Sequence, residues 1–198
     1  MTAAKNPRDA YQKAFAQVLA RVQQALSVAQ PDAFPISMSI AGGAALNLLT
    51  GARVTEDVDA TFSKRVLLGE DIEVSYRDAD GRARVMYLDR NYNDSLGLMH
   101  ENAYPDSEPI SVAGIDKALI AVRVLAPVDL AVSKLVRFSD QDREDILLLA
   151  RHGLIDSASL RKRAGEALGG YVGNLKVVQT SIDVACRLID SVRASKQT

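Results

Sequence analysis

Asp57 and Asp59 are the residues whose type and spacing most directly indicate chemistry. On a strand, residues i and i+2 point to the same side, roughly 6–7 Å apart along the chain, so both carboxylates face one way. Carboxylate oxygens fixed on one rigid element suit hard divalent cations such as Mg²⁺. Upstream, Gly42-Gly43 indicates a turn into a helix, whose first backbone N–H groups can bind a phosphate. Together these parts suit metal-assisted phosphoryl or nucleotidyl transfer.

The elements that must position these residues follow from the apolar pattern. Alternation predicts a strand over 36–40, and the glycine pair ends it. A short helix follows over 44–50, closed by Gly51, and a second strand over 55–63 carries the carboxylates. Upstream, apolar residues at helical spacing predict a helix from about 7 to 30, whose apolar stripe packs into the core.

The rest of the chain divides into a strand-rich part and a helical part. Further strands are predicted over 72–76, 85–89 and 117–125, the first two as an antiparallel pair around a turn at 78–81. Between the strands 85–89 and 117–125, the segment 91–116 is predicted to be loop with one irregular helix near Leu96–His100. In the helical part, Pro127 is predicted as the first residue of one helix, and Ser139 and Asp156 as the N-caps of the next two. A long last helix follows, whose apolar residues begin at Tyr171.

These elements predict an α+β fold in which a mixed sheet with flanking helices is followed by a C-terminal helical bundle. We expect an α/β domain over 1–126 and a helical domain over 127–198. At 198 residues the chain is long enough for this arrangement, and a hydrophobic content of 47% predicts a folded protein.

Charge and cysteine content narrow the function class. The net charge of −1 provides no overall basic field for nucleic acid, although a local basic patch remains compatible with it. A single cysteine, Cys186, excludes a disulfide framework and a cysteine zinc site. The first residues contain no apolar signal region, and no run approaches ~18 apolar residues, so we expect a soluble cytoplasmic protein without a membrane partner.

Four segments carry a resemblance to a known family: Gly42–Leu46 (GGAAL), Arg53–Asp59 (RVTEDVD), Asp129–Leu135 (DLAVSKL) and Asp142–Ile146 (DREDI). In this order they resemble the minimal nucleotidyltransferase families of the DNA polymerase β-like superfamily. These families include nucleotidyltransferase-type toxins of bacterial abortive-infection and toxin–antitoxin systems. The resemblance covers residues from about 36 to 155 and implies a nucleotidyltransferase-like sheet.

The resemblance implies a role for each motif. Asp57 and Asp59 would hold Mg²⁺ against the triphosphate of a nucleotide, and the backbone at Gly42 and Gly43 would cradle phosphates. Lys134 would be a point charge on the triphosphate or on the developing pyrophosphate. The motif also makes two further residues nucleotide-binding candidates: Arg53 and Thr55.

A third carboxylate usually completes the metal site in these families and can act as the base for the attacking hydroxyl. Asp89, at the end of the next long strand, is the first candidate. Glu73, an acidic residue between Ile72 and Val74, is the alternative. One departure concerns the phosphates: many members have Gly-Ser where this chain has Gly43-Ala44, and the missing hydroxyl weakens the expectation of tight triphosphate binding.

Several charged residues have two interpretations. Arg53 either contacts phosphate or pairs with a neighbouring carboxylate, and Arg143 and Asp145 either orient Lys134 or belong to an ion network. The basic run 161–163 either touches RNA phosphates or forms a solvated helix face. His100 and His152 have no suitably spaced partner residues and are not expected to bind a metal.

Two hypotheses follow for the whole chain. The first is a Mg²⁺-dependent nucleotidyltransferase that moves NMP from an NTP to a hydroxyl of RNA, such as a tRNA end, or of a protein. Its specific version is a toxin that acts beside an antitoxin. The second is a catalytically inactive nucleotidyltransferase fold that serves as a binding or regulatory module, such as an antitoxin.

Overall fold

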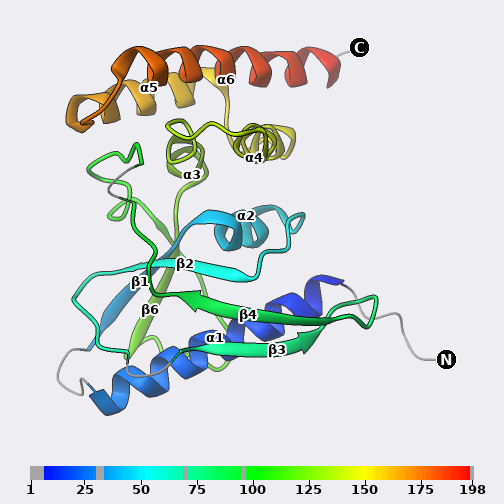
Figure 1. Ribbon diagram of the computed structural model, residues 1–198, viewed down its shortest axis with the longest axis vertical. Helices are drawn as coiled ribbons and strands as arrows, with labels where there is room; N and C mark the ends of the chain where they lie inside the picture. Colours follow the sequence, from blue (N-terminus) through cyan, green and yellow to red (C-terminus); the bar gives the residue numbers. More distant parts are fainter. Residues whose placement is uncertain (1–6, 30–33, 69–70, 95–96, 197–198) are drawn as a thin grey trace. The chain divides into compact units, whose positions relative to one another are not determined.

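The computed structural model describes residues 7–29, 34–68, 71–94 and 97–196 (Figure 1). The chain forms two compact units. The N-terminal unit comprises Met1–Tyr92 and Glu108–Val124, and the helical unit comprises Asn93–Ser107 and Leu125–Thr198. The predicted domain boundary at residue 126 stays a prediction. By compactness alone, the segment 93–107 groups with the helices and not with the sheet.

The N-terminal unit is built on a mixed sheet with strand order β3-β4-β2-β1-β6-β5. Its strands are β1 (Ile36–Ile40), β2 (Asp57–Phe62), β3 (Glu73–Arg77), β4 (Ala83–Asp89), β5 (Glu108–Pro109) and β6 (Ile120–Val124). β1 runs antiparallel to β2 and parallel to β6, and β2 runs parallel to β4. β3 and β4 form an antiparallel pair, as the alternation and the turn at 78–81 predicted.

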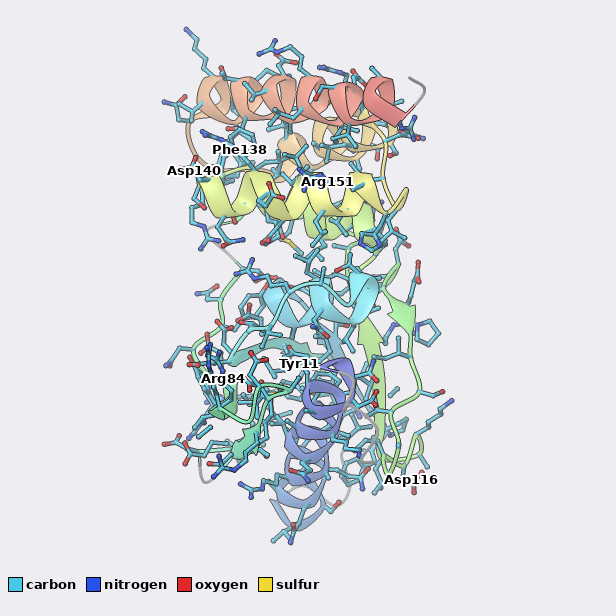
Figure 2. The ribbon with its side chains drawn as sticks, turned by 90° about the vertical axis from the view of Figure 1, so that its right-hand side faces the viewer. Tyr11, Arg84, Asp116, Phe138, Asp140 and Arg151 are labelled. Carbon is cyan, nitrogen blue, oxygen red and sulfur yellow. The ribbon has the colours of Figure 1, made fainter. Side chains whose placement is uncertain are left out.

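Two helices complete this unit: α1 (Pro7–Ala29) and α2 (Gly42–Thr50). α1 packs on β3 and β4 through a buried stripe at helical spacing that begins with Tyr11 and Phe15. Figure 2 labels Tyr11 on this helix. Val58, Val74, Met86 and Leu88 are buried on the same side of the sheet. Since side chains alternate along a strand, the residues between them point to the opposite, open face.

The helical unit contains α3 (Pro127–Val132), α4 (Asp140–Arg151), α5 (Ser157–Ala167), a 3-10 turn η2 (Leu168–Gly170) and α6 (Leu175–Lys196). Ser139 caps α4 and Asp156 caps α5, each in a capping box, as the sequence predicted. The buried stripe of α6 consists of Val178, Ile182, Ala185 and Ile189. No helix in the described part of the chain is long and apolar enough to span a membrane.

Together the two units confirm the predicted α+β class, with a mixed sheet, flanking helices and C-terminal helices. Four local predictions were wrong. The predicted loop over 91–116 contains the short strand β5, and the last helix begins at Leu175 and not at Tyr171. Gly42 and Gly43 do not precede α2 but form its first turn. The irregular helix expected near Leu96–His100 is not formed over residues 97–100, and Leu96 itself lies outside the described residues. The segment from Glu101 to Asp106 instead forms hydrogen-bonded turns.

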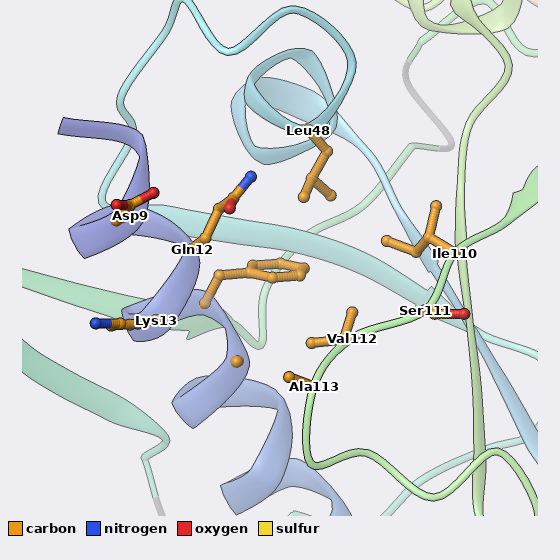
Figure 3. A pocket seen from close by; sticks show the side chains of 10 residues that line it. Asp9, Gln12, Lys13, Leu48, Ile110, Ser111, Val112 and Ala113 are labelled. Carbon is orange, nitrogen blue, oxygen red and sulfur yellow. The ribbon is translucent and has the colours of Figure 1, made fainter. Parts of the chain in front are cut away.

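One cavity of about 480 Å³ lies in the N-terminal unit between α1, α2 and the segment that follows β5 (Figure 3). Phe15, Leu48, Ile110 and Val112 supply apolar walls, while Asp9 and Lys13 of α1 are exposed. None of the residues predicted for the catalytic site lines this cavity.

Candidate active site

The predicted carboxylates lie on the open face of the sheet in the N-terminal unit. β2 and β4 pair in parallel so that Asp57 is opposite Tyr87, Val58 opposite Leu88, and Asp59 opposite Asp89. Because Val58 and Leu88 are buried, the three aspartates all belong to the other face. Neighbouring strands are about 4.8 Å apart, so Asp89 is the nearest cross-strand carboxylate to Asp59.

Glu73, the alternative third carboxylate, lies one strand further away. It is opposite Tyr87 on β3 and shares the open face, but β4 separates it from β2. Two strand spacings, about 10 Å, therefore lie between the backbones of Glu73 and Asp57. The sheet register favours Asp89 as the partner of the β2 carboxylates.

Both glycines bring the first turn of α2 against the acidic strand. Gly42 has a φ of 55°, and a Cβ atom at this position would lie 1.8 Å from Asp59 Oδ2. A Cβ on Gly43 would lie 3.0 Å from Thr55 Cβ. Any side chain at Gly42 would therefore collide with Asp59, and left-handed backbone adds a second reason for glycine. Ala41, the N-cap of α2, makes no side-chain cap hydrogen bond.

The carboxylates have local contacts in this structure. Thr55 donates its hydroxyl to Asp57 Oδ1, and Asp59 Oδ2 lies against Gly42. Asp89 Oδ1 accepts the N–H of Asn91 at 2.8 Å. The oxygen donors and the shared face fit a hard cation such as Mg²⁺. Among the described residues, however, no three His, Cys, Asp or Glu side chains are placed closely enough to hold one ion.

Arg53 precedes the acidic strand and is anchored through its backbone. The side-chain amide of Asn47, on α2, donates to the carbonyl oxygen of Arg53. The side chain of Arg53 is half-buried. Burial raises the pKa of Tyr11, and the positive charge of Arg53 opposes only part of that rise. Its contact with a phosphate stays a prediction.

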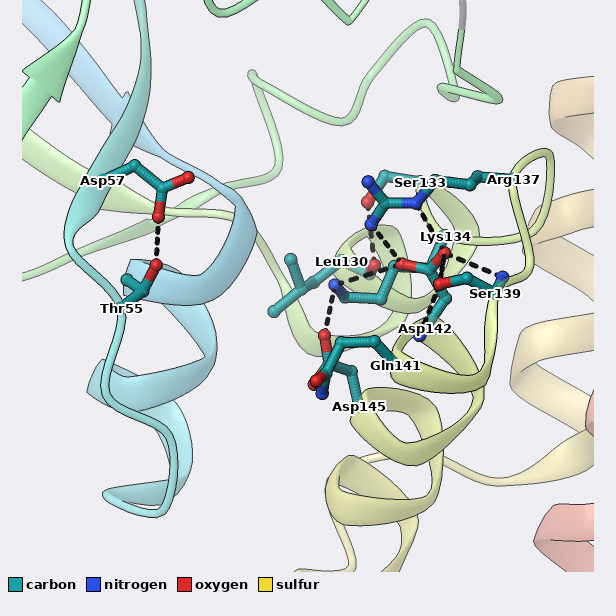
Figure 4. A network of polar contacts seen from close by, with 10 residues as sticks. All are labelled: Thr55, Asp57, Leu130, Ser133, Lys134, Arg137, Ser139, Gln141, Asp142 and Asp145. Atoms are coloured by element: carbon teal, nitrogen blue, oxygen red, sulfur yellow. Dashed lines mark hydrogen bonds and ion pairs between the residues drawn. The ribbon is translucent and has the colours of Figure 1, made fainter.

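Lys134 belongs to the helical unit, in the turn after α3, and is almost fully buried (Figure 4). Its Nζ donates to Asp145 Oδ2 at 2.7 Å and lies 3.8 Å from Asp142 Oδ1. Within this unit the ammonium charge of Lys134 is therefore neutralised by two aspartates of α4. This arrangement is compatible with both interpretations of Asp145 from the sequence: it orients Lys134, or it belongs to an ion network. Its contact with a triphosphate stays a prediction.

Asp142 holds the network together. It accepts two hydrogen bonds from Arg137, at 2.7 and 2.6 Å, and one each from the hydroxyl and the N–H of Ser139. Burial raises the pKa of Asp142, but the hydrogen bonds from Arg137 and Ser139 outweigh it and bring the pKa to about 2. The sequence identified Ser139 as a cap, but contained no signal that its partner Asp142 would also bind Arg137.

Other charged candidates are engaged elsewhere in the helical unit. Arg143 does not join Lys134: it donates to Asp140 at 2.9 Å and lies over the ring of Phe138. In the basic run, Arg161 pairs with Asp183, and Arg163 binds Asp129 and Asp106. These bonds with Asp129 and Asp106 raise the pKa of Arg163 against the effect of burial. The run is thus largely matched by carboxylates.

Neither histidine has the surroundings of a metal ligand in the described structure. His100 Nε2 lies 3.6 Å from Glu166 Oε2, and its Nδ1 accepts the N–H of Asn102. His152 is the C-cap residue of α4.

Tyr87 is a residue of the open face that the sequence analysis did not single out. It is opposite Asp57 in the sheet and two residues before Asp89, and it is 41% exposed. Partial burial and the negative charges of Asp57 and Asp89 raise the pKa of its hydroxyl. The available signal was its position: on a strand that ends in Asp89, residue 87 must share the face of that carboxylate.

Comparison with known proteins identifies the family of this chain. One solved structure with similarity is that of an antigenic nucleotidyltransferase-like protein from Paracoccidioides brasiliensis. It is 16% identical, covers 92% of this chain and 91% of its own, and has a TM-score of 0.40, which does not by itself establish a common fold. No curated protein matches. A family described as "Nucleotidyltransferase of unknown function (DUF6036)" matches residues 17–174. This match includes the acidic strands, the glycine pair and Lys134, and the chain belongs to this nucleotidyltransferase family.

Proposed function

We propose that the protein is a Mg²⁺-dependent nucleotidyltransferase that moves NMP from an NTP to an acceptor hydroxyl. The observation that carries this proposal is the pairing of Asp59 with Asp89 on the open face, with Gly42 packed against Asp59. Asp57, Asp59 and Asp89 would hold the ion. Bound there, Mg²⁺ would neutralise charge on the α-phosphate and on the leaving pyrophosphate.

The remaining roles are those that the family resemblance implies. The backbone at Gly42 and Gly43 would bind phosphate oxygens, with Thr55 and Arg53 beside them on the chain. Lys134 would add a positive charge toward the triphosphate, oriented by Asp145 and Asp142. Asp89 would also take the proton of the attacking hydroxyl.

The proposal includes the acceptor and the biological setting. The acceptor is a hydroxyl of RNA, such as a tRNA end, or of a protein. The family resemblance supports a toxin that is controlled by an antitoxin or acts in phage defence. Induced expression in a bacterial host should then arrest growth, and Asp57→Ala/Asp59→Ala should relieve the arrest. A small regulator-like reading frame beside the gene would further support the pairing.

A direct assay tests the enzymatic proposal. The protein is incubated with α-labelled NTPs, Mg²⁺ and either total RNA or total protein, beside the Asp57→Ala/Asp59→Ala variant. Label transfer by the wild type that is lost in the variant is the expected result. No transfer, together with no NTP-dependent thermal shift in Mg²⁺, contradicts the proposal.

One alternative has specific support. An inactive nucleotidyltransferase fold that acts as a binding or regulatory module, such as an antitoxin, fits three observations. Ala44 stands where many relatives have serine, the carboxylates do not converge on one point among the described residues, and Lys134 is already neutralised. The absence of transfer in the assay above, with retained binding to a partner protein, would favour this alternative.

A further inference from the structure

The open face of the sheet in the N-terminal unit carries more than carboxylates. Beside the β2 row of Thr55, Asp57 and Asp59, the β4 row presents Val85 and Tyr87 before Asp89. Val85 and Tyr87 are 38% and 41% exposed. Exposed large apolar side chains at successive same-face positions, directly beside a polar site, call for an explanation beyond packing.

Strand order separates the two flanks of the acidic strand. β2 lies between β1 on one side and β4 on the other. Gly42 follows β1 and lies against Asp59, so the predicted phosphate cradle is on the β1 flank. Tyr87 is opposite Asp57 on the β4 flank. A nucleotide whose phosphates occupy the first flank leaves the second for the molecule that is modified.

The chemistry of the β4 flank fits an unpaired nucleic-acid end. An exposed tyrosine ring offers a face on which a base can stack, whatever its identity. Val85 extends this apolar surface along the strand, and Arg77 lies on the same face one strand away, because it shares the alternation of Glu73 and Ser75. Arg77 is exposed and its Nη1 donates to Gly81 O at 2.8 Å, so its charge is held at the far end of this flank, opposite Ala83, where it can meet the phosphate backbone; the β3 residue opposite Tyr87 itself is Glu73.

We propose that Tyr87, with Val85, is the stacking surface for the terminal base of a single-stranded nucleic-acid acceptor. This inference rests on the proposed nucleotidyl transfer and names its acceptor class. The terminal hydroxyl forms the new bond to the α-phosphorus, the bond between that phosphorus and pyrophosphate breaks, and the hydroxyl proton passes to Asp89. Stacking on Tyr87 holds the terminal nucleotide over the β4 flank during this step.

The test measures binding separately from transfer. A fluorescent single-stranded oligoribonucleotide, and the DNA of the same sequence, are titrated in the absence of NTP against wild type, Tyr87→Ala and Tyr87→Phe. Leu67→Ala is the control, because Leu67 is an exposed apolar residue outside the β3 and β4 strands. Thermal melting of each variant checks that the fold is intact.

Loss of the ring should weaken binding by roughly 5- to 100-fold, as for other base-stacking residues, while Tyr87→Phe and Leu67→Ala bind as wild type does. In the transfer assay, Tyr87→Ala should raise KM for the oligonucleotide and leave KM for the NTP unchanged. RNA and DNA arms show which strand is preferred, and either preference supports the inference.

Three results overturn it: wild-type protein that binds neither strand, equal affinity of wild type and Tyr87→Ala, or a Tyr87→Phe variant as weak as Tyr87→Ala. Transfer to a protein hydroxyl that is unaffected by Tyr87→Ala also overturns it, and leaves the proposed function standing. Conversely, Tyr87-dependent binding with neither transfer nor an NTP-dependent thermal shift in Mg²⁺ supports the stacking surface and contradicts the proposed function.

Discussion

Two groups of aspartates, one in each unit, have opposite surroundings. Asp142 and Asp145 of the helical unit are buried and are matched by the cationic side chains of Lys134 and Arg137. On the open face of the N-terminal unit, Asp57 and Asp89 accept hydrogen bonds from a neutral hydroxyl and from a backbone N–H. Charge that is neutralised inside a unit supports its fold. Charge that is clustered at a surface is available to an added cation.

Buried polar atoms without a hydrogen-bond partner also differ between the two units. Among the described residues, three buried side-chain atoms have no hydrogen-bond partner, on Tyr11, Asn47 and Tyr76. All three residues belong to the N-terminal unit. The helical unit, by contrast, satisfies its buried Lys134 and Asp142 several times over. The buried polar groups of the N-terminal unit are therefore less fully satisfied than those of the helical unit, and the following predictions test whether this lowers its stability.

The largest effect should come from the open face, and on activity alone. Asp57→Asn or Asp59→Asn should lower nucleotidyl transfer by about 10³-fold or more, because each change removes a charged ligand of the proposed ion. The melting temperature should stay constant or rise, since one of several neighbouring negative charges is removed. Asp71→Asn is the matched control, because Asp71 is a highly exposed carboxylate of the same unit. A strong loss of stability in the open-face variants would contradict the contrast between the units.

The helical unit should respond in stability instead. Asp145→Ala leaves the buried Lys134 ammonium without its nearest carboxylate and should cost about 3–5 kcal/mol of unfolding free energy. Asp140→Ala, at a highly exposed position of the same helix, should cost well under about 1 kcal/mol. Chemical denaturation measures both.

Replacing both Lys134 and Asp145 distinguishes a structural role of Lys134 from a role in nucleotidyl transfer. Lys134→Met/Asp145→Leu removes both charges and should recover most of the stability lost in Asp145→Ala. If this folded double variant still transfers NMP at the wild-type rate, the proposed triphosphate contact of Lys134 is wrong. A loss of transfer in the folded variant supports it.

The loss of stability at acid pH should depend on the protonation of Asp142. Its folded-state pKa of about 2 lies below the ordinary 3.8, so its contribution is fully present above about pH 4 and is lost as pH falls toward 2. The difference corresponds to about 2 kcal/mol. Arg137→Met removes two of the hydrogen bonds that lower this pKa. The acid-unfolding midpoint should therefore move to higher pH. An unchanged midpoint would show that Ser139 and Lys134 are enough to keep the pKa of Asp142 low.

The sequence predicted local structure better than the site. Helical spacing, Gly51 and the caps Ser139 and Asp156 identified most elements, because these signals act within one or two turns of the chain. The register of β2 on β4 depends on contacts about thirty residues apart, so the sequence left Asp89 and Glu73 open as third carboxylate; the register favours Asp89, and its role stays a prediction. Likewise, no local pattern indicates that Lys134 is buried, since its surroundings are formed by a different helix.

The smallest predicted effect is a change in unfolding free energy on Tyr→Phe substitution, which should have opposite signs in the two units. Tyr11 is buried with an unpartnered hydroxyl, whose pKa is raised by burial and by nearby negative charge that includes Asp57. Tyr11→Phe removes a polar atom that has no compensating bond, so it should stabilise the protein by about 1 kcal/mol. Tyr104 of the helical unit donates its hydroxyl to Asp94, and Tyr104→Phe should destabilise by a similar amount. Urea denaturation of both variants gives the two signs. Destabilisation by Tyr11→Phe would mean that its hydroxyl binds an ordered water molecule or supports Asp57, and that the polar groups beneath the open face are satisfied as fully as those of the helical unit.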